Sequence, residues 1–192
     1  MKAFLGALCA CLLIATAHAA TDVAGVKFDD RSRLGEHALV LNGAGVRTKF
    51  FFKVYAMALY LPATARDTAA VLAMPGARRI DIVTLRELTA AQLAEALADG
   101  LRKNLDATAL TAMQPRIDRF TATMLTLGEA KEGTRIGIDF VPDRGTAVRV
   151  NGAPLGEAIE GRDFSDALLK VWLGEAPAQA DLKQSLLGGT AP

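Results

Sequence analysis

The spacing of apolar and polar positions changes twice along the chain and divides it into three blocks. Over the first block the positions alternate with a period of two, the pattern of β-strands. The middle block has the three-to-four-residue spacing of amphipathic helices, and the last third returns to strands, with a tight turn at Asn151-Gly152, before it ends in helices. The expected strands cover residues 23–28, 37–42, 46–61, 78–85, 134–142 and 145–156. This order predicts an α+β fold in which an antiparallel sheet has its helices massed on one side.

The start of the first helix carries a capping signal. Thr89 is placed as the N-cap, and Gln92 follows three residues later, which is the spacing of a capping box. One helical face then collects Leu93, Ala96, Leu97, Gly100 and Leu101. Glycine costs a helix about 1 kcal/mol relative to alanine, so we expect a close packing contact at Gly100.

The later helices carry weaker signals. A second helix is expected over residues 109–127, with a kink or restart at Pro115 because proline cannot donate a backbone hydrogen bond. Asp163 is placed as the N-cap of a third helix and Gly174 as its end. Pro177 is expected to open a final helix.

The stretch LNGAGVRTKFFFKVYAMALYL, residues 41–61, opens with glycines that imitate part of a dinucleotide-binding fingerprint. Thr48 stands where the third glycine should be, and a strand pattern follows where pyrophosphate binding needs a helix N-terminus. These two departures exclude the nucleotide interpretation. The glycines are more typical of a bulge or a tight turn between strands.

The same stretch places positive charge at the start of an apolar strand. If residues 46–61 form one strand, then Arg47, Lys49, Phe51, Lys53, Tyr55 and Met57 share a face. A turn near Thr48 and Lys49 would reset this register. Two interpretations of Arg47 follow. It screens a sheet edge, or its guanidinium binds a carboxylate or oxyanion at the mouth of an apolar cleft, with Tyr55 as a hydroxyl partner.

Residues 1–19 have the composition of a secretory signal peptide. An early lysine precedes an apolar run shorter than the about 20 residues of a membrane span, and the run ends in Ala-His-Ala, a pattern that signal peptidase accepts. A membrane anchor is the less favoured alternative. We therefore expect secretion, with the periplasm as the destination, no stable membrane span after cleavage, and one domain over residues 20–192.

The composition of the mature chain argues against several classes of function. Cys9 and Cys11 leave with the signal peptide, so no disulfide or thiol nucleophile is expected. Loss of Lys2 leaves 21 basic residues against 21 acidic ones, so the mature chain has no net positive charge to attract nucleic acid. His37 is the one remaining histidine, which argues against metal sites and Ser-His-Asp catalysis. We expect no metal, no cofactor and no nucleic-acid partner.

Residues 43–61 resemble the chalcone isomerase-like family. The pattern is a Gly-Ala-Gly turn, an arginine soon after it, and an aromatic and lysine-rich strand that ends in Tyr60-Leu61. The C-terminal DFSDALLKVWLGEAPAQADLKQSLLG is similar to that of secreted bacterial members, and the likeness covers residues 23–188. The resemblance implies an open-faced β-sandwich, in which a large antiparallel sheet, a smaller sheet and a helical layer line a ligand cleft.

The family contains true isomerases and non-catalytic fatty-acid-binding relatives, so the resemblance implies roles position by position. Arg47 matches the arginine that faces the ligand in both branches. Tyr55 is similar to a tyrosine of the fatty-acid binders, where the enzymes carry threonine. On the helix that closes the cleft, Gln92, Glu95 and Asp99 stand where the enzymes place a tyrosine, a lysine and an asparagine. Two acids there would repel a phenolate, which argues against chalcone cyclisation.

The sequence thus favours a secreted binder of a fatty acid or a similar amphipathic carboxylate. Arg47 is expected to anchor the acid, Tyr55 to hydrogen-bond to it, and apolar side chains to form the walls. The expected wall residues are Phe51, Met57, Leu97 and Leu101. One alternative is an intramolecular lyase that cyclises a phenolic enone, with Arg47 stabilising the developing negative charge. Another is a structural or partner-binding envelope protein whose cleft is filled by its own side chains.

Overall fold

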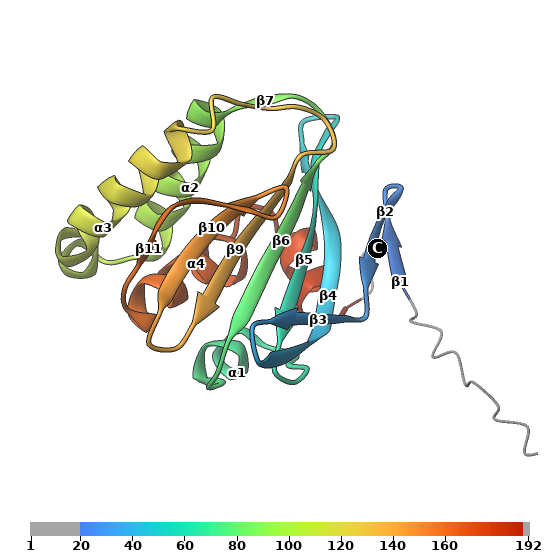
Figure 1. Cartoon of the computed structure of the whole chain (residues 1–192), viewed down its shortest axis with the longest axis horizontal. Helices are drawn as coiled ribbons and strands as arrows, with labels where there is room; N and C mark the ends of the chain where they lie inside the picture. The colour runs from blue at the N-terminus through green and yellow to red at the C-terminus, as the bar shows by residue number, and fades with distance from the viewer. Residues whose placement is uncertain (1–19, 190–192) are drawn as a thin grey trace, which may run out of the picture.

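The computed structural model describes residues 20–189, so the predicted signal peptide, residues 1–19, lies outside the described part. Its centre is a seven-stranded antiparallel sheet in the order β11-β10-β9-β6-β5-β4-β3, which curls over helices on one face (Figure 1). The strands are β1 (Ala20–Val23), β2 (Val26–Asp29), β3 (Arg31–Leu34), β4 (His37–Lys49), β5 (Phe52–Leu61), β6 (Arg78–Thr84), β7 (Leu88–Thr89), β8 (Glu129–Ala130), β9 (Arg135–Val141), β10 (Gly145–Val150) and β11 (Ala153–Ile159). The helices are α1 (Thr68–Ala73), α2 (Ala90–Asn104), α3 (Ala107–Leu125), α4 (Arg162–Leu173) and α5 (Ala180–Leu186). The predicted α+β class is confirmed.

The stretch that could have been one long strand is a hairpin. β4 ends at Lys49, Phe50 and Phe51 form the turn, and β5 begins at Phe52. Of the two possibilities left by the sequence, the turn is therefore correct, and it lies just beyond its expected place. Alternation alone could not reveal it, because no glycine, asparagine or proline marks the reversal.

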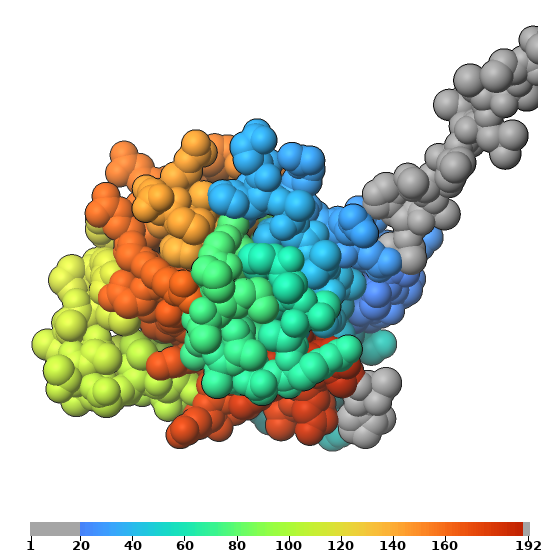
Figure 2. All heavy atoms as spheres, turned by 90° about the horizontal axis from the view of Figure 1, so that it is seen from below, coloured from blue at the N-terminus to red at the C-terminus, as the bar shows by residue number. Residues whose placement is uncertain are grey.

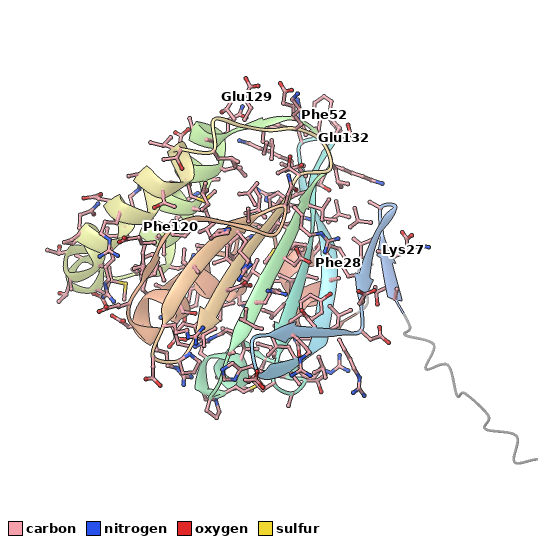
Figure 3. The ribbon with its side chains drawn as sticks, viewed as in Figure 1. Lys27, Phe28, Phe52, Phe120, Glu129 and Glu132 are labelled. Atoms are coloured by element: carbon pink, nitrogen blue, oxygen red, sulfur yellow. The ribbon has the colours of Figure 1, made fainter. Side chains whose placement is uncertain are left out.

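The sheet buries apolar residues on both faces. From β5, Met57 and Leu59 pack on the helical side together with residues of α2, α3 and α4. Ala56 and Ala58 point to the opposite side, where Phe28 of β2 covers them. Figure 3 shows Phe28 turned from the β1–β2 hairpin toward the sheet. Small side chains on that side let the hairpin approach closely, which accounts for the alternation of large and small residues along β5.

The boundaries of α2 and α3 follow local signals. The Thr89 hydroxyl accepts a hydrogen bond from the Gln92 N–H at 3.1 Å, and the Gln92 side chain accepts one from the Thr89 N–H at 3.0 Å, so the capping box is confirmed. α3 begins at Ala107 behind an Asp106 cap and continues through Pro115, where a kink or restart was expected. Its buried face of Met113, Ile117, Phe120 and Met124 holds the helix together despite the lost hydrogen bond.

The start of α4 differs from the prediction. Gly161 is its N-cap, whereas Asp163 lies in the first turn and pairs with Arg116 of α3 at 2.6 Å. The long-range ion pair therefore replaces the local cap. α4 ends before Gly174, as expected, and α5 begins later than Pro177 indicated. Among the described residues, no helix combines the length and the apolar character needed to cross a membrane.

Gly43 and Gly45 allow α5 to lie directly on β4. A β-carbon at Gly43 would stand 2.7 Å from the Leu186 carbonyl oxygen, and one at Gly45 would stand 2.8 Å from the Ser185 β-carbon. The register of β4 with β5 shifts at Asn42, whose side-chain amide donates to the Leu186 carbonyl at 2.7 Å. The expected bulge is therefore present, and the glycines serve helix packing rather than a turn.

α1 and the C-terminal helices meet on the underside of the molecule. The Thr68 hydroxyl donates to the Leu173 carbonyl at 2.6 Å, and Arg162 donates to the Met74 carbonyl at 2.9 Å. Figure 2 shows this side, where the green of α1 and its flanking loops meets the red of the C-terminal helices. Segments about one hundred residues apart thus close the helical layer against the sheet.

Candidate functional site

Arg47 and Tyr55 lie opposite each other on adjacent strands. They are partners in the β4–β5 ladder, and residues paired in this way point to the same side of a sheet. Both side chains are half-buried on the side that carries the helices. They share a face, as the sequence predicted, but across a hairpin rather than along a single strand.

The Tyr55 hydroxyl is the acceptor of a partly buried hydrogen bond. Trp172 Nε1 of α4 donates to it at 2.9 Å, and Trp172 itself is almost fully buried. Burial raises the pKa of Tyr55, while the hydrogen bond from Trp172 and the charge of Arg47 offset part of that rise. The hydroxyl is therefore protonated at neutral pH. The indole N–H uses one acceptor position of the Tyr55 hydroxyl, which can still donate its own hydrogen.

Uncharged groups hold the Arg47 guanidinium. Nη1 donates to Gln179 Oε1 at 3.2 Å and to the backbone carbonyl of Thr48. Gln179 Oε1 also accepts the Thr48 N–H, at 2.8 Å. This arrangement fixes the side chain without neutralising it. Within residues 20–189, Arg47 forms no ion pair with a carboxylate.

Every other arginine that is at least half-buried in the described chain forms an ion pair with a carboxylate, whereas Arg47 does not. The other three pair with aspartates across short distances. These pairs are Arg78–Asp166 at 2.7 Å, Arg79–Asp139 at 2.6 Å and Arg116–Asp163 at 2.6 Å. Removing a charge from water is costly unless an opposite charge compensates for it. The guanidinium of Arg47 has no such compensating acid among the described residues.

Three of the four predicted wall residues lie on the helical side of the sheet. Met57 follows Tyr55 on the same face of β5, and Leu97 and Leu101 lie on the buried face of α2. All three belong to one apolar cluster and have less than a tenth of their surface exposed. Phe51 does not join them. It is 97 % exposed at the hairpin tip, because the chain reverses there.

The polar residues of α2 face away from the sheet. Gln92 completes the capping box, Glu95 is exposed, and Asp99 pairs with Lys103 at 2.7 Å. These positions lie on the opposite side of the helix from its buried leucines. The expectation that acids on this helix would repel a phenolate in the cleft does not hold in this structure.

The described hollows lie away from Arg47. One of about 10 Å³ lies under α4 beside Arg78 and Leu168. A wider one of about 270 Å³ lies on the opposite face of the sheet, lined in part by Arg79, Asp81 and Arg135. Arg135 pairs with Asp81 at 2.6 Å there, so the charges of this hollow are largely satisfied by the protein. No group of three or more histidine, cysteine or acidic side chains is placed to hold a metal within residues 20–189.

Two residues of the site escaped the sequence reasoning. Trp172 lies 117 residues from Tyr55, and Gln179 lies 132 residues from Arg47. No sequence pattern identifies Gln179 as a site residue, because it stands in the connection before α5. In the sequence, Trp172 falls on the apolar face of a predicted helix, as an ordinary core residue would. Its status as the one tryptophan of the chain was the available signal.

Known proteins share this architecture. The family described as chalcone isomerase-like matches residues 20–188. A solved structure, the fatty-acid binding protein AtFAP1 of Arabidopsis thaliana, is similar with a TM-score of 0.62 and 13 % identity, over 85 % of this chain and 92 % of that one. Among curated proteins, no sequence shows significant similarity. The chain belongs to the chalcone isomerase-like family.

Proposed function

We propose that this chain is a secreted binder of a fatty acid or a similar amphipathic carboxylate. Arg47 would be the anionic anchor, and Tyr55 would donate a hydrogen bond. The observation that carries the proposal is the half-buried guanidinium of Arg47, which has no acidic partner among the described residues. The likeness to a plant fatty-acid binding protein supports it at the level of the fold.

The two parts of such a ligand would contribute differently. A hydrogen bond to a charged group is worth about 1.5–3 kcal/mol, which suffices to choose and orient the headgroup. Each buried methylene adds about 0.8 kcal/mol, so ten buried carbons give roughly 8 kcal/mol before the costs of association. The acyl chain would therefore supply most of the affinity.

Side chains now occupy the space that the acyl chain would need. Met57, Leu97 and Leu101 pack between the sheet and α2 with little exposed surface. Entry of a long chain therefore requires α2 to move away from the sheet, and binding selects a more open form of the protein. We expect association to be slower than for a preformed cavity.

The two alternatives make different demands on the same geometry. Cyclisation of a phenolic enone would use Arg47 for the developing negative charge, and no other described feature favours it over binding. A cleft filled by its own side chains would fit the packing of Met57 and Leu97 and would bind no small molecule. Both alternatives are separated from the proposal by a binding measurement.

The test is a titration with oleate followed by the fluorescence of Trp172, the one tryptophan, whose indole contacts Tyr55. Loss of the charge-assisted bond predicts at least a tenfold weaker affinity for Arg47→Gln. Arg144→Gln, in the exposed turn after β9, is the matched control and should bind like the parent. Oleyl alcohol should bind the parent and Arg47→Gln equally, because it has no carboxylate.

Three results would count against the proposal. Equal oleate affinity of the parent and Arg47→Gln would leave Arg47 with the edge-screening role, since residues 43–49 pair only with β5 in the described sheet. No oleate binding by the parent would favour the self-filled cleft. Cyclisation of a chalcone faster than in buffer, without oleate binding, would favour the lyase.

A further inference from the structure

Three consecutive phenylalanines form the tip of the β4–β5 hairpin and lie in solvent. Phe50 is 84 % exposed, Phe51 97 % and Phe52 61 %. Leu125 of α3 is the one other large hydrophobic residue of the described chain that is strongly exposed, at 49 %, and it stands alone. Isolated apolar residues are normal on a protein surface, whereas a contiguous patch marks an interaction site.

The backbone of the tip adds a second observation. Phe50 has φ +56°, in the left-handed region that bulky residues rarely adopt. Turns of two residues between strands favour glycine, asparagine or aspartate at such positions. The chain therefore places an aromatic side chain where local stability favours glycine, and a strained position of this kind points to a functional role for the side chain.

Positive charges surround the tip on both sides of the hairpin. Lys49 pairs with Phe52 across the ladder, and Thr48 pairs with Lys53, so the two exposed lysines point to opposite sides. The Arg86 guanidinium lies 5.1 Å from the centre of the Phe52 ring. No acidic residue occurs between Arg47 and Tyr55.

Acidic residues lie at the same end of the molecule. Glu87 follows Arg86 in the loop after β6, and Figure 3 shows Glu129 and Glu132 near Phe52. These carboxylates belong to neighbouring segments and not to the hairpin itself. The hairpin tip is thus a cationic, aromatic projection on a surface of mixed charge.

We propose that this tip docks the protein on an anionic lipid surface. The phenylalanine rings would enter the boundary between headgroups and acyl chains, while Lys49, Lys53 and Arg86 contact the phosphates. Arg47 and Tyr55 each lie three positions from the nearest phenylalanine of the tip, so docking brings their site to the membrane. The proposal goes beyond fatty-acid binding and does not depend on it.

The size of the patch favours lipid over a protein partner. An aromatic side chain can bury roughly 150–250 Å², so three of them stay below the about 800 Å² per partner of a standard protein interface. A second copy of this chain would also bring like charges together, because each tip carries Lys49 and Lys53. An anionic membrane matches both the apolar rings and the surrounding cations.

The experiment is flotation of the processed chain, residues 20–192, with vesicles of equimolar phosphatidylglycerol and phosphatidylcholine, and with vesicles of phosphatidylcholine alone. We expect binding to the anionic vesicles that weakens at high salt. Phe50→Gly/Phe51→Ser should reduce that binding at least tenfold without lowering the melting temperature, because glycine suits the backbone of position 50. Lys49→Gln/Lys53→Gln should lose the preference for anionic vesicles.

Leu125→Ser is the matched control and should bind like the parent, since that exposed leucine lies on α3 and is not part of the hairpin. Equal vesicle binding by the parent and the Phe50→Gly/Phe51→Ser variant would overturn the proposal. So would a parent that binds neither kind of vesicle. A parent that forms a dimer in sedimentation, while the aromatic variant stays monomeric and neither floats, would assign the tip to self-association instead.

Discussion

Trp172 donates a 2.9 Å hydrogen bond to the hydroxyl of Tyr55 and thereby ties α4 to the centre of the sheet. Tyr55 is also the ladder partner of Arg47. One hydrogen bond between residues far apart in the chain thus fixes the position of the hydroxyl on the face of the sheet that also carries Arg47. The candidate site depends on this contact.

Removal of the Tyr55 hydroxyl should lower the free energy of unfolding. Tyr55→Phe leaves the buried indole N–H of Trp172 without an acceptor, and an unsatisfied buried donor costs about 1–3 kcal/mol of unfolding free energy. Urea denaturation measures this loss. The double variant Tyr55→Phe/Trp172→Phe should cost less than the sum of the two single changes, because the pair is lost only once. Strict additivity would show that the two side chains do not interact.

Stability should fall at alkaline pH. Burial raises the pKa of Tyr55, and burial together with Asp81 and Asp29 raises the pKa of Tyr60. For both tyrosines the pKa in the folded state lies above the pKa in the unfolded state. Their contribution to the free energy of unfolding is therefore fully present below about pH 10, the unfolded-state pKa, and is lost as pH rises toward the folded-state pKa values.

The measurement is urea denaturation from neutral to strongly alkaline pH, together with the absorbance of tyrosinate. Tyr55 and Tyr60 are the two tyrosines of the chain, so the absorbance signal is specific. Folded protein should show little tyrosinate near pH 10, where free tyrosine is half-ionised. Tyr55→Phe should reduce the alkaline loss of stability. Full ionisation of both residues in the folded protein near pH 10 would contradict the prediction.

A methyl group at Gly43 should loosen the contact between β4 and α5. Its carbon would press against the backbone carbonyls of Ser185 and Leu186, which have little room to move. Overpacking of this kind costs about 1–3 kcal/mol, and we expect Gly43→Ala to lower the unfolding free energy by about 2 kcal/mol. Gly137→Ala in β9 is the control, because the nearest atom there is 3.7 Å away. Equal stability of the two variants would contradict the prediction.

The buried Arg78 should be sensitive to the loss of its partner. Its guanidinium is paired with Asp166 at 2.7 Å and lies 5.1 Å from the ring centre of Phe140. Asp166→Ala leaves this cation buried without an acid, and we expect a cost of about 3 kcal/mol, the low end for a broken buried pair. Arg78→Met should cost less, since Asp166 keeps a contact with Arg162 at 3.6 Å. Thermal unfolding of the two variants gives the order of stability, and the reverse order would contradict this account.

Local signals in the sequence were sufficient where a few neighbouring residues decide the structure. The capping box of Thr89 and Gln92 sets the start of α2, because both hydrogen bonds close within one turn. Asn151 and Gly152 form the predicted hairpin turn with φ values of +50° and +85°, which their side chains tolerate. The glycine at position 100 predicted a close packing contact, although only the structure identifies Val171 as the neighbour.

The turn at Phe50 and Phe51 could not be predicted in the same way. Neither residue favours a turn, and the apolar alternation continues across the reversal. The pairing of β4 with β5 is stabilised by packing on both faces of the sheet, and this packing overrides local preference. The same reversal moved Phe51 from the expected ligand wall to the exposed tip.

The order of strands and helices along the chain, and hence the α+β class, follows from the spacing of apolar residues, because burial of one face requires that spacing. Local patterns predict only part of the site, the shared face of Arg47 and Tyr55. Arg47, Tyr55, Trp172 and Gln179 come from β4, β5, α4 and the start of α5. The contacts of Trp172 with Tyr55 and of Gln179 with Arg47 span more than one hundred residues of chain, and only the packing of the helices against the sheet brings these pairs together.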